Sequence, residues 1–435
     1  MRPLILTIAL TATLGHVGWC GELTEEQILG QADARIEKYR KGDAVLKLIG
    51  PDRKPIPAGT TVSIEQTRHK FLFGANIYKF DDCRTPEENV AYKQRFRELL
   101  NFATVRFYWV SYEIEEGQLE FEDRLKISRW CLDNGITPKG HPLFWSECQP
   151  EWVHKKDPEK AEELAFSRVG REISDFRGVI GMWDVLNEPS KGIEQARQLN
   201  AVTALRIYQR YGKVEVVKRA FERARKANPK ATLILNDHPY PLDDPNIVLT
   251  RFEKIVKECL DQDVPIDGIG IQTHMVLKRR EWSVKRTWEI LEQFATFGKP
   301  LHFTELTIIS GWHSNEERQA KLAAQFYTIL FSHPSVEAIT WWDFTEQKYR
   351  GAIRAPGAGL IREDMTPKPA YHALKRLIRG KWWTRANARV IALGEARFRG
   401  FFGQYKATVT VGGHELTGVF SFDKSVQQPI HVALN

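Results

Sequence analysis

The most constraining feature of this sequence is an alternation of short apolar runs and longer amphipathic runs over residues 71–379. Each of eight apolar runs has the length of a buried strand, and a stretch with helical periodicity follows it. Such alternation implies a parallel sheet, and eight units over roughly 300 residues predict an α/β fold, a closed (β/α)8 TIM barrel. The predicted strands are Phe71–Ile77, Ala103–Trp109, Thr137–Gly140, Met182–Asn187, Thr232–Asn236, Gly268–Gln272, Leu301–Thr304 and Ala338–Trp342.

Helices are expected between these strands. They include Pro86–Leu100, Glu122–Asn134, Ala201–Asn228, Asn246–Asp261, Ser283–Phe297 and Glu316–His333. A doubly wound open sheet is the alternative, but that fold wants a glycine-rich phosphate-binding loop after its first strand. Phe73-Gly74-Ala75-Asn76 lacks this pattern, so the closed barrel is favoured.

Two flanking regions depart from the barrel pattern. Residues 22–70 begin with a charged helical stretch, Thr24–Lys41, and continue with two alternating runs that predict an N-terminal β-hairpin, Ala44–Leu48 and Thr61–Gln66. Helical periodicity disappears in residues 380–435, which predict a small β-rich extension, packed alone or with the hairpin. Its expected strands are Phe398–Tyr405, Lys406–Val411, Gly418–Phe422 and Pro429–Leu434.

Residues 1–20 have the pattern of a signal peptide. Arg2 precedes an apolar run, Leu4–Leu14, and small and polar residues follow it. That run is too short to span a bilayer, and no later run approaches about 18 apolar residues. We therefore expect a secreted or periplasmic monomer without a membrane span. Trp19 before Cys20 argues against a lipoprotein anchor, which wants a small residue there.

Four cysteines remain after this leader: Cys83, Cys131, Cys148 and Cys259. In an exported chain they can form one or two disulfides, and the sequence leaves the pairing open. None has the close paired spacing of a zinc site.

Charge and aromatic content bear on the partners. Lys and Arg (63) exceed Asp and Glu (55) by a formal net charge of +8, but no run of five basic residues occurs. Scattered positive charge argues against nucleic acid as a partner. The chain also has 13 Trp, and flat apolar rings line sugar-binding clefts as well as protein cores.

Catalytic residues of TIM barrels lie at the C-terminal ends of strands. Nearly every predicted strand here ends in a group that hydrogen-bonds, ionises or stacks. An inert barrel would show Gly, Ser and Asp turn residues instead. These groups are Asn76, Trp109, His141, Glu188, Asn236, Asp237, Gln272, His274, Glu305, Trp342 and Asp343.

Two of these strand ends carry a glutamate, Glu188 in Trp183–Pro189 and Glu305 in His302–Leu306. Two carboxyl groups over one cleft suit glycoside hydrolysis, in which one protonates the leaving oxygen and the other attacks the anomeric carbon or activates water. No metal or cofactor is expected, because Gly-Ala-Asn stands where metal-dependent barrel hydrolases have His-x-His. A serine nucleophile is disfavoured because Gly-x-Ser-x-Gly is absent.

Five segments resemble glycoside hydrolase family 10, the endo-β-1,4-xylanase family, over roughly Phe71 to Arg379. The family motifs are Arg-Gly-His-Thr-Leu-Val-Trp, Trp-Asp-Val-Val-Asn-Glu, Gly-Ile-Gly-Ile-Gln-x-His, Thr-Glu-Leu and Lys-Pro-Ala-Tyr. The segments similar to them, in this order, are Lys139–Trp145, Trp183–Glu188, Gly268–His274, Thr304–Leu306 and Lys368–Tyr371.

The resemblance implies a retaining double displacement, with Glu188 as the acid/base and Glu305 as the nucleophile. His274 would orient Glu305, and no cofactor is implied. The residues expected to hold the sugar at the cleavage point are Asn187, His141, Gln272, Trp145 and Trp342, with Asn76 and Lys79 as further candidates.

Three departures from the family pattern concern the cleft. Thr307 follows Thr-Glu-Leu, where the family usually has Asp. The stretch Thr104–Trp109 lacks the Asn and Lys of the family's Glu-Asn-x-Met-Lys-Trp motif. The second cleft tryptophan is replaced in the Tyr349–Gly351 region. The glycone side of the cleft is thus rebuilt, and one hypothesis is that Arg106 or Lys79 contacts an acidic sugar.

The sequence thus predicts a secreted retaining endo-β-1,4-xylanase that acts on xylan. One alternative is a β-glycanase of the same clan with another or an acidic polysaccharide as substrate. The other is a barrel that binds carbohydrate without cutting it, but such a protein would usually have lost one of the two carboxylates.

Overall fold

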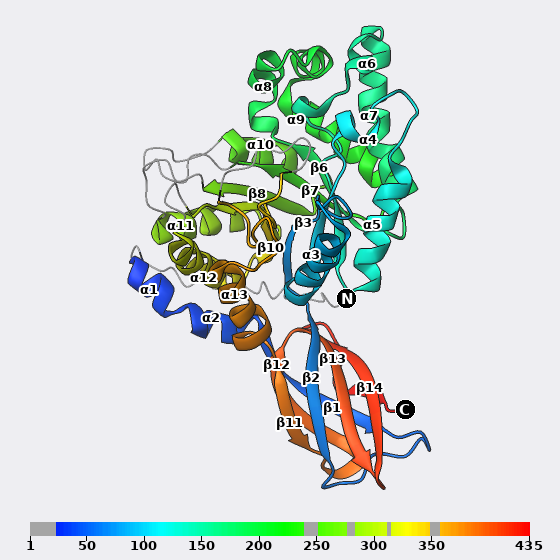
Figure 1. Cartoon of the computed structure of the whole chain (residues 1–435), viewed down its shortest axis with the longest axis vertical. Coiled ribbons are helices and arrows are strands. Elements are labelled where there is room, and N and C mark those ends of the chain that lie inside the picture. Colours follow the sequence, from blue (N-terminus) through cyan, green and yellow to red (C-terminus); the bar gives the residue numbers. More distant parts are fainter. Residues whose placement is uncertain (1–22, 239–250, 276–282, 311–314, 349–356) are drawn as a thin grey trace, which may run out of the picture.

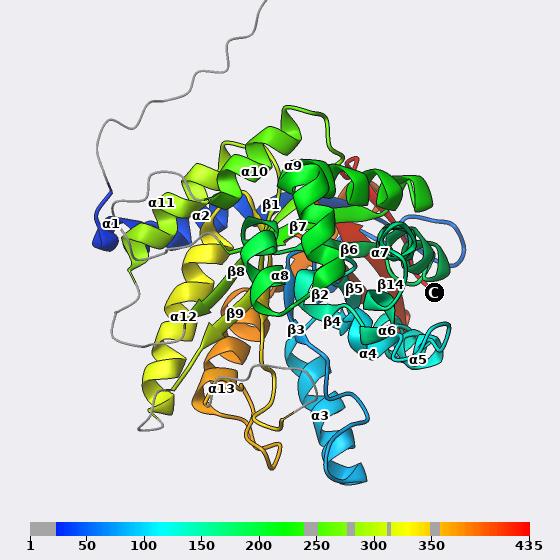
Figure 2. The same cartoon turned by 90° about the horizontal axis from the view of Figure 1, so that it is seen from above.

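The computed structural model describes residues 23–238, 251–275, 283–310, 315–348 and 357–435. These residues form a barrel of strands surrounded by helices and, beside it, a second group of strands drawn in blue and orange-red (Figure 1). The view along the barrel shows the helices around the strands (Figure 2).

The barrel is a closed sheet in which β3 to β10 follow each other in chain order and β10 pairs with β3. All eight pairs of neighbouring strands in the barrel are parallel. The predicted TIM barrel is confirmed, with all eight expected strands. Their bounds are β3 Leu72–Asn76, β4 Phe102–Arg106, β5 Thr137–His141, β6 Met182–Asn187, β7 Thr232–Asp237, β8 Gly268–Met275, β9 Leu301–Ile308 and β10 Val336–Trp341.

The barrel strands form from continuous apolar runs because both of their faces are buried. All eight residues of β9 are buried, as are the last five of β6 and of β7. The helices cover the outside of this sheet with one apolar face each. Three begin at a residue whose side chain accepts a hydrogen bond from the third residue of the helix: Thr85, Ser283 and Asn315.

The helices of the structure agree with the predicted ones within a few residues. The start predicted at Asn246 lies outside the described residues, and helix α9 contains a non-helical break at Gly212. The helices are α3 Pro86–Leu99, α4 Trp109–Tyr112, α5 Phe121–Asp133, α6 Glu151–His154, α7 Pro158–Asp175, α8 Gly192–Gln198, α9 Val202–Ala227, α10 Arg251–Leu260, α11 Val284–Ala295, α12 Glu316–Ser332 and α13 Pro369–Arg376.

The strands outside the barrel form two small sheets around a separate apolar cluster, here called the β-sandwich; all of their pairs are antiparallel except β1 with β15. One sheet has the order β12-β1-β15 and the other the order β11-β2-β13-β14. The bounds are β1 Lys41–Ile49, β2 Thr61–His69, β11 Arg385–Arg389, β12 Glu395–Phe401, β13 Gly403–Val411, β14 His414–Phe422 and β15 Ile430–Ala433.

The predicted N-terminal β-hairpin is wrong. Both strands exist, but β1 and β2 lie in different sheets and pair with strands from the far end of the chain. Leu46 of β1 lies between Ala396 and Ile430, and Ile64 of β2 lies between Ala386 and Ala407. Each strand buries one apolar face, and the C-terminal strands supply more apolar surface than a two-stranded hairpin can.

Two further details of the flanking regions differ from the prediction. The single expected strand Phe398–Tyr405 is divided between β12 and β13, and β11 was not predicted. The expected helix Thr24–Lys41 is two helices, α1 Glu25–Gly30 and α2 Ala32–Tyr39, separated at Gln31.

The β-sandwich lies against the amino-terminal ends of the barrel strands. Arg40 donates hydrogen bonds to the carbonyl groups of Phe331, His333 and Val336, and Val336 is the first residue of β10. Arg68 of β2 bonds to Thr137, the first residue of β5. The carboxyl ends of the strands therefore face away from the β-sandwich.

The four cysteines at positions 83, 131, 148 and 259 are all free thiols. Among the described residues, no helix combines the length and the apolar character needed to cross a membrane.

Candidate active site

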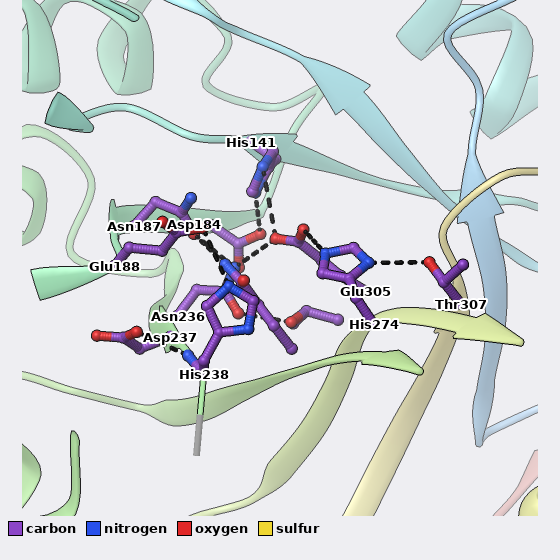
Figure 3. Close-up of polar contacts among 12 residues, drawn as sticks. His141, Asp184, Asn187, Glu188, Asn236, Asp237, His238, His274, Glu305 and Thr307 are labelled. Carbon is purple, nitrogen blue, oxygen red and sulfur yellow. Dashed lines mark hydrogen bonds and ion pairs between the residues drawn. The ribbon is translucent and has the colours of Figure 1, made fainter. Parts of the chain in front are cut away.

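The carboxyl ends of β5 to β9 bring the predicted acidic, amide and histidine side chains together (Figure 3). Glu188 follows β6, and Glu305 lies within β9. Both carboxyl groups are nearly buried, with exposed fractions of 7% and 4% for the two residues.

Glu188 has a left-handed backbone, with φ 55° and ψ 48°, which is uncommon for a residue with a side chain. Its N–H donates to the carbonyl group of Asn236 at 2.8 Å, so the turn is fixed against β7. Gln195 of α8 donates to one carboxylate oxygen at 2.6 Å, and the Nε2 atom of His238 lies 3.4 Å from the other.

The surroundings of Glu188 have opposing effects on its pKa. Burial raises the pKa of Glu188, but the hydrogen bonds from His238 and Gln195 and nearby positive charge outweigh it and lower the pKa to about 2. Burial lowers the pKa of His238, against the attraction of the Glu188 carboxylate. The resting site therefore favours an ionised Glu188.

Two further carboxyl groups lie beside Glu188. Burial, and then the charge of Glu188, raise the pKa of Asp237 to about 7, although Asp237 accepts hydrogen bonds from Ser190. Burial also raises the pKa of Glu147, which shares the amide N–H donors of Gln195 with Glu188. Added negative charge beside Glu188 favours its protonated form.

Side chains from three other strands of the barrel surround the Glu305 carboxylate. Asn236 of β7 donates to Oε1 at 2.8 Å, and Nε2 of His274 in β8 lies 3.0 Å from Oε2. Nε2 of His141 in β5 lies 3.7 Å from Oε1. These contacts fix the orientation of the Glu305 carboxylate.

An amide network joins the two glutamates. Asn187 precedes Glu188, and its Oδ1 atom accepts hydrogen bonds from Asn236 at 2.7 Å and from Gln272 at 2.9 Å. Because that oxygen is used, the Nδ2 group of Asn187 is the part left to donate to a ligand. Asn236 thus contacts Asn187, Glu305 and, through its backbone carbonyl, Glu188.

A buried ion pair orients His141. Asp184 of β6 accepts from Nζ of Lys139 at 2.6 Å and lies 2.7 Å from Nδ1 of His141. Lys139 and Asp184 are fully buried. Burial raises the pKa of Asp184, but the charge of Lys139 and the hydrogen bond from His141 outweigh burial, so the pKa is lowered. The carboxylate accepts the Nδ1 proton of His141, so the Nε2 atom faces Glu305.

Aromatic rings form one side of the site. Trp342, after β10, packs edge-on against His141 and Tyr78 with ring centroids 5.2 and 5.7 Å apart. Tyr108 contacts Tyr78 at 5.8 Å and Trp145 at 5.6 Å. Trp145 and Trp342, both expected at the site, thus belong to one wall. Tyr78 and Tyr108 were not predicted as part of it.

The remaining candidates lie beside this wall. Asn76 is buried at the end of β3. Lys79 is also buried, and its ammonium forms an ion pair with Asp82 at 2.9 Å. Arg106 ends β4, and its guanidinium lies 5.8 Å from the centre of the Tyr78 ring.

Sequence reasoning missed several contacts in the site. Lys139 and Asp184 stand inside the two motifs that were recognised, yet no role was inferred for either. Asn236 was noted only as a polar strand end, although its position after an apolar run was a usable signal. Gln195 and His238 gave no signal, because their contacts depend on how the segments after β6 and β7 fold back over Glu188.

A TIM barrel whose strand ends carry two buried glutamates, amide donors and an aromatic wall has the make-up of a glycoside hydrolase site. The sequence profile of glycosyl hydrolase family 10 matches residues 65–377. The chain belongs to this family, as its motifs predicted.

Individual relatives agree with this membership. Endo-1,4-beta-xylanase B of Thermotoga neapolitana is 30% identical over 63% of this chain and 78% of its own length. The anti-sigma-I factor RsgI6 of Acetivibrio thermocellus is 28% identical over 89% of this chain, which spans 47% of that protein. Native xylanase 10B of Thermotoga maritima has the same fold, with a TM-score of 0.59, 25% identity, and coverage of 72% of this chain and 96% of its own.

The grouping of possible metal ligands can be described for part of the chain. Among the described residues, no three His, Cys, Asp or Glu side chains are grouped so that they could hold a metal ion.

Proposed function

We propose that this protein is an exported endo-β-1,4-xylanase that hydrolyses internal bonds of xylan by a retaining double displacement. Glu188 is the acid/base and Glu305 the nucleophile. The observation that carries the proposal is the shared amide network, in which Asn236 contacts the backbone of Glu188 and the carboxylate of Glu305. Xylanases among the similar proteins support xylan as the substrate.

In the first step, Glu305 attacks the anomeric carbon while Glu188 protonates the leaving oxygen. Glu188 must bring a proton to this step, although its pKa is low in the resting site. A sugar in the cleft removes water from the carboxyl group, and it also removes the water that screens Glu188 from the charge of Glu305. Both influences raise the pKa of Glu188.

In the second step, Glu188 takes a proton from water, and that water breaks the glycosyl ester on Glu305. Nδ2 of Asn187 faces the sugar as the donor for its 2-hydroxyl, since Oδ1 is occupied by Asn236 and Gln272. Hydrogen bonds to this hydroxyl strengthen in the transition state. Because each of the two displacements inverts the anomeric carbon, its configuration is retained overall.

The experiment is reducing-sugar release from unbranched and glucuronic-acid-decorated xylan, β-glucan and cellulose. Glu305→Ala should lower kcat/KM on xylan by about 10⁴-fold or more, because a lone nucleophile is lost. Glu222→Ala, an exposed glutamate of α9, is the matched control and should leave the rate unchanged. NMR of the first product should show the β-anomer.

Other outcomes would change the proposal in defined ways. Activity on another glycan alone, lost in Glu305→Ala, would keep the mechanism and replace the substrate. Binding of polysaccharide without hydrolysis of any glycan would contradict the proposed function and favour a barrel that binds without cutting.

A further inference from the structure

A hydrogen-bonded chain of three residues ends at the nucleophile. Nε2 of His274 lies 3.0 Å from Oε2 of Glu305, and Nδ1 lies 2.9 Å from Oγ1 of Thr307 (Figure 3). Glu305 and Thr307 both lie in β9 and point to the same side, so one ring of β8 contacts both. Thr307 is buried, with an exposed fraction of 2%.

The partners determine where the proton of His274 lies. The Glu305 carboxylate only accepts hydrogen bonds, so Nε2 must carry a proton. Thr307 can donate or accept, and it donates when Nδ1 is a lone pair. Donation satisfies all three groups with a neutral ring, whereas acceptance requires a charged imidazolium. A carboxylate at position 307 could only accept and would favour the imidazolium.

The charge of His274 matters because a second imidazole, that of His238, lies beside it. Among the residues that the structure describes, the groups that face the His274 ring are Glu305 and Thr307 of β9, His238 and Trp342. The ring centroids of His238 and Trp342 lie 5.8 and 6.1 Å from that of His274. His238 in turn lies against Glu188. The two rings therefore form a row between the two catalytic carboxyl groups, and two positive charges in that row would repel each other.

We propose that Thr307 is a positioning residue that keeps His274 neutral, as an Nε2–H donor to the nucleophile. This inference rests on the proposed function for its catalytic meaning, but the state of His274 can be measured in the free protein.

The first test is ¹⁵N NMR of the histidine side chains at pH 7, with His274 assigned from its absence in His274→Gln. The wild type should show two widely separated nitrogen resonances, with the proton on Nε2. Thr307→Asp should bring the two resonances close together, as in an imidazolium. A charged ring in the wild type, or a proton on Nδ1 alone, would overturn the proposal.

The second test separates the hydroxyl group from the shape of residue 307. Thr307→Val keeps the shape and removes the donor, and should lower kcat by roughly 3- to 10-fold with little change in KM, as expected for one neutral hydrogen bond. Thr307→Ser restores the donor and should lie within about 2-fold of the wild type. Equal losses in both variants would contradict a role for the hydroxyl group.

A failure of the proposed function can be distinguished from a failure of the inference on Thr307. If the wild type hydrolysed no glycan, the catalytic roles would be withdrawn. The ¹⁵N spectra of the wild type and of Thr307→Asp would still decide whether Thr307 keeps His274 neutral.

Discussion

The barrel was predicted together with the pairing of its strands, whereas in the β-sandwich most strands were predicted but the pairing of β1 with β2 was wrong. In the barrel, strands that are consecutive in the chain are neighbours in the sheet, from β3 to β10. In the β-sandwich, β1 and β2 pair with strands from the opposite end of the chain: Glu65 of β2 and Arg385 of β11 are 320 residues apart. Local patterns identify strands in both regions, but they identify partners only where neighbours in sequence are neighbours in space.

The largest expected effect tests whether the β-sandwich is needed by the barrel. Deleting Gly380–Asn435 removes every partner of β1 and β2 and exposes apolar residues such as Leu46 and Ile64. Unpaired strand edges and exposed apolar faces favour aggregation, so the truncated chain should be insoluble on expression. The measurement is the soluble fraction by sedimentation.

A smaller deletion is the control for this truncation. Removing residues 424–435 takes away β15 but leaves β12 beside β1, so part of the soluble protein should remain. A soluble, fully active barrel after the larger deletion, with weaker binding to insoluble polysaccharide as its only loss, would show that the β-sandwich is a binding element.

A pair of core substitutions sharpens the comparison. Leu46→Ala in β1 and Ile234→Ala in β7 each remove a fully buried aliphatic side chain. Each should reduce the free energy of unfolding by about 2–5 kcal/mol, measured by urea denaturation. Only Ile234→Ala should also lower kcat/KM, because β7 carries Asn236. An equal loss of activity in Leu46→Ala would mean that the β-sandwich influences the site.

The smallest expected effect concerns pH at the junction of the two regions. His69 ends β2, its Nδ1 atom lies 3.2 Å from Gln66, and burial lowers its pKa to about 3 from an ordinary 6.5. The unfolded chain therefore binds a proton more readily than the folded one. Between pH 6.5 and about 3, His69 should cost up to ~1.4 kcal/mol of stability per pH unit as the pH falls.

The variant His69→Gln removes this titration and should flatten the dependence of the free energy of unfolding on pH. Urea denaturation at several pH values measures the slope. Exposed His414→Gln on β14 serves as the control and should leave the slope as in the wild type. An unchanged slope in His69→Gln would show that His69 does not control acid unfolding.

As with the barrel, part of the candidate site could be predicted from the sequence. Glu188 follows the buried strand β6, and Glu305 lies in the carboxyl-terminal half of β9. Strand ends in a parallel barrel meet at one face, so the convergence of the two glutamates could be predicted from the pattern. The contacts of Gln195 and His238 with Glu188 did not follow. They depend on the path of loops after β6 and β7, for which no short-range rule exists.

The distance in sequence between β1 and β2 and their partner strands affects the order in which the β-sandwich can form during synthesis. A ribosome makes β1 and β2 first, then the whole barrel, and only afterwards β11 to β15. Domains generally fold as they emerge, so the barrel can close while β1 and β2 still wait for strands that have not been translated. The strands of the β-sandwich that precede the barrel are therefore completed only by strands that are made after it.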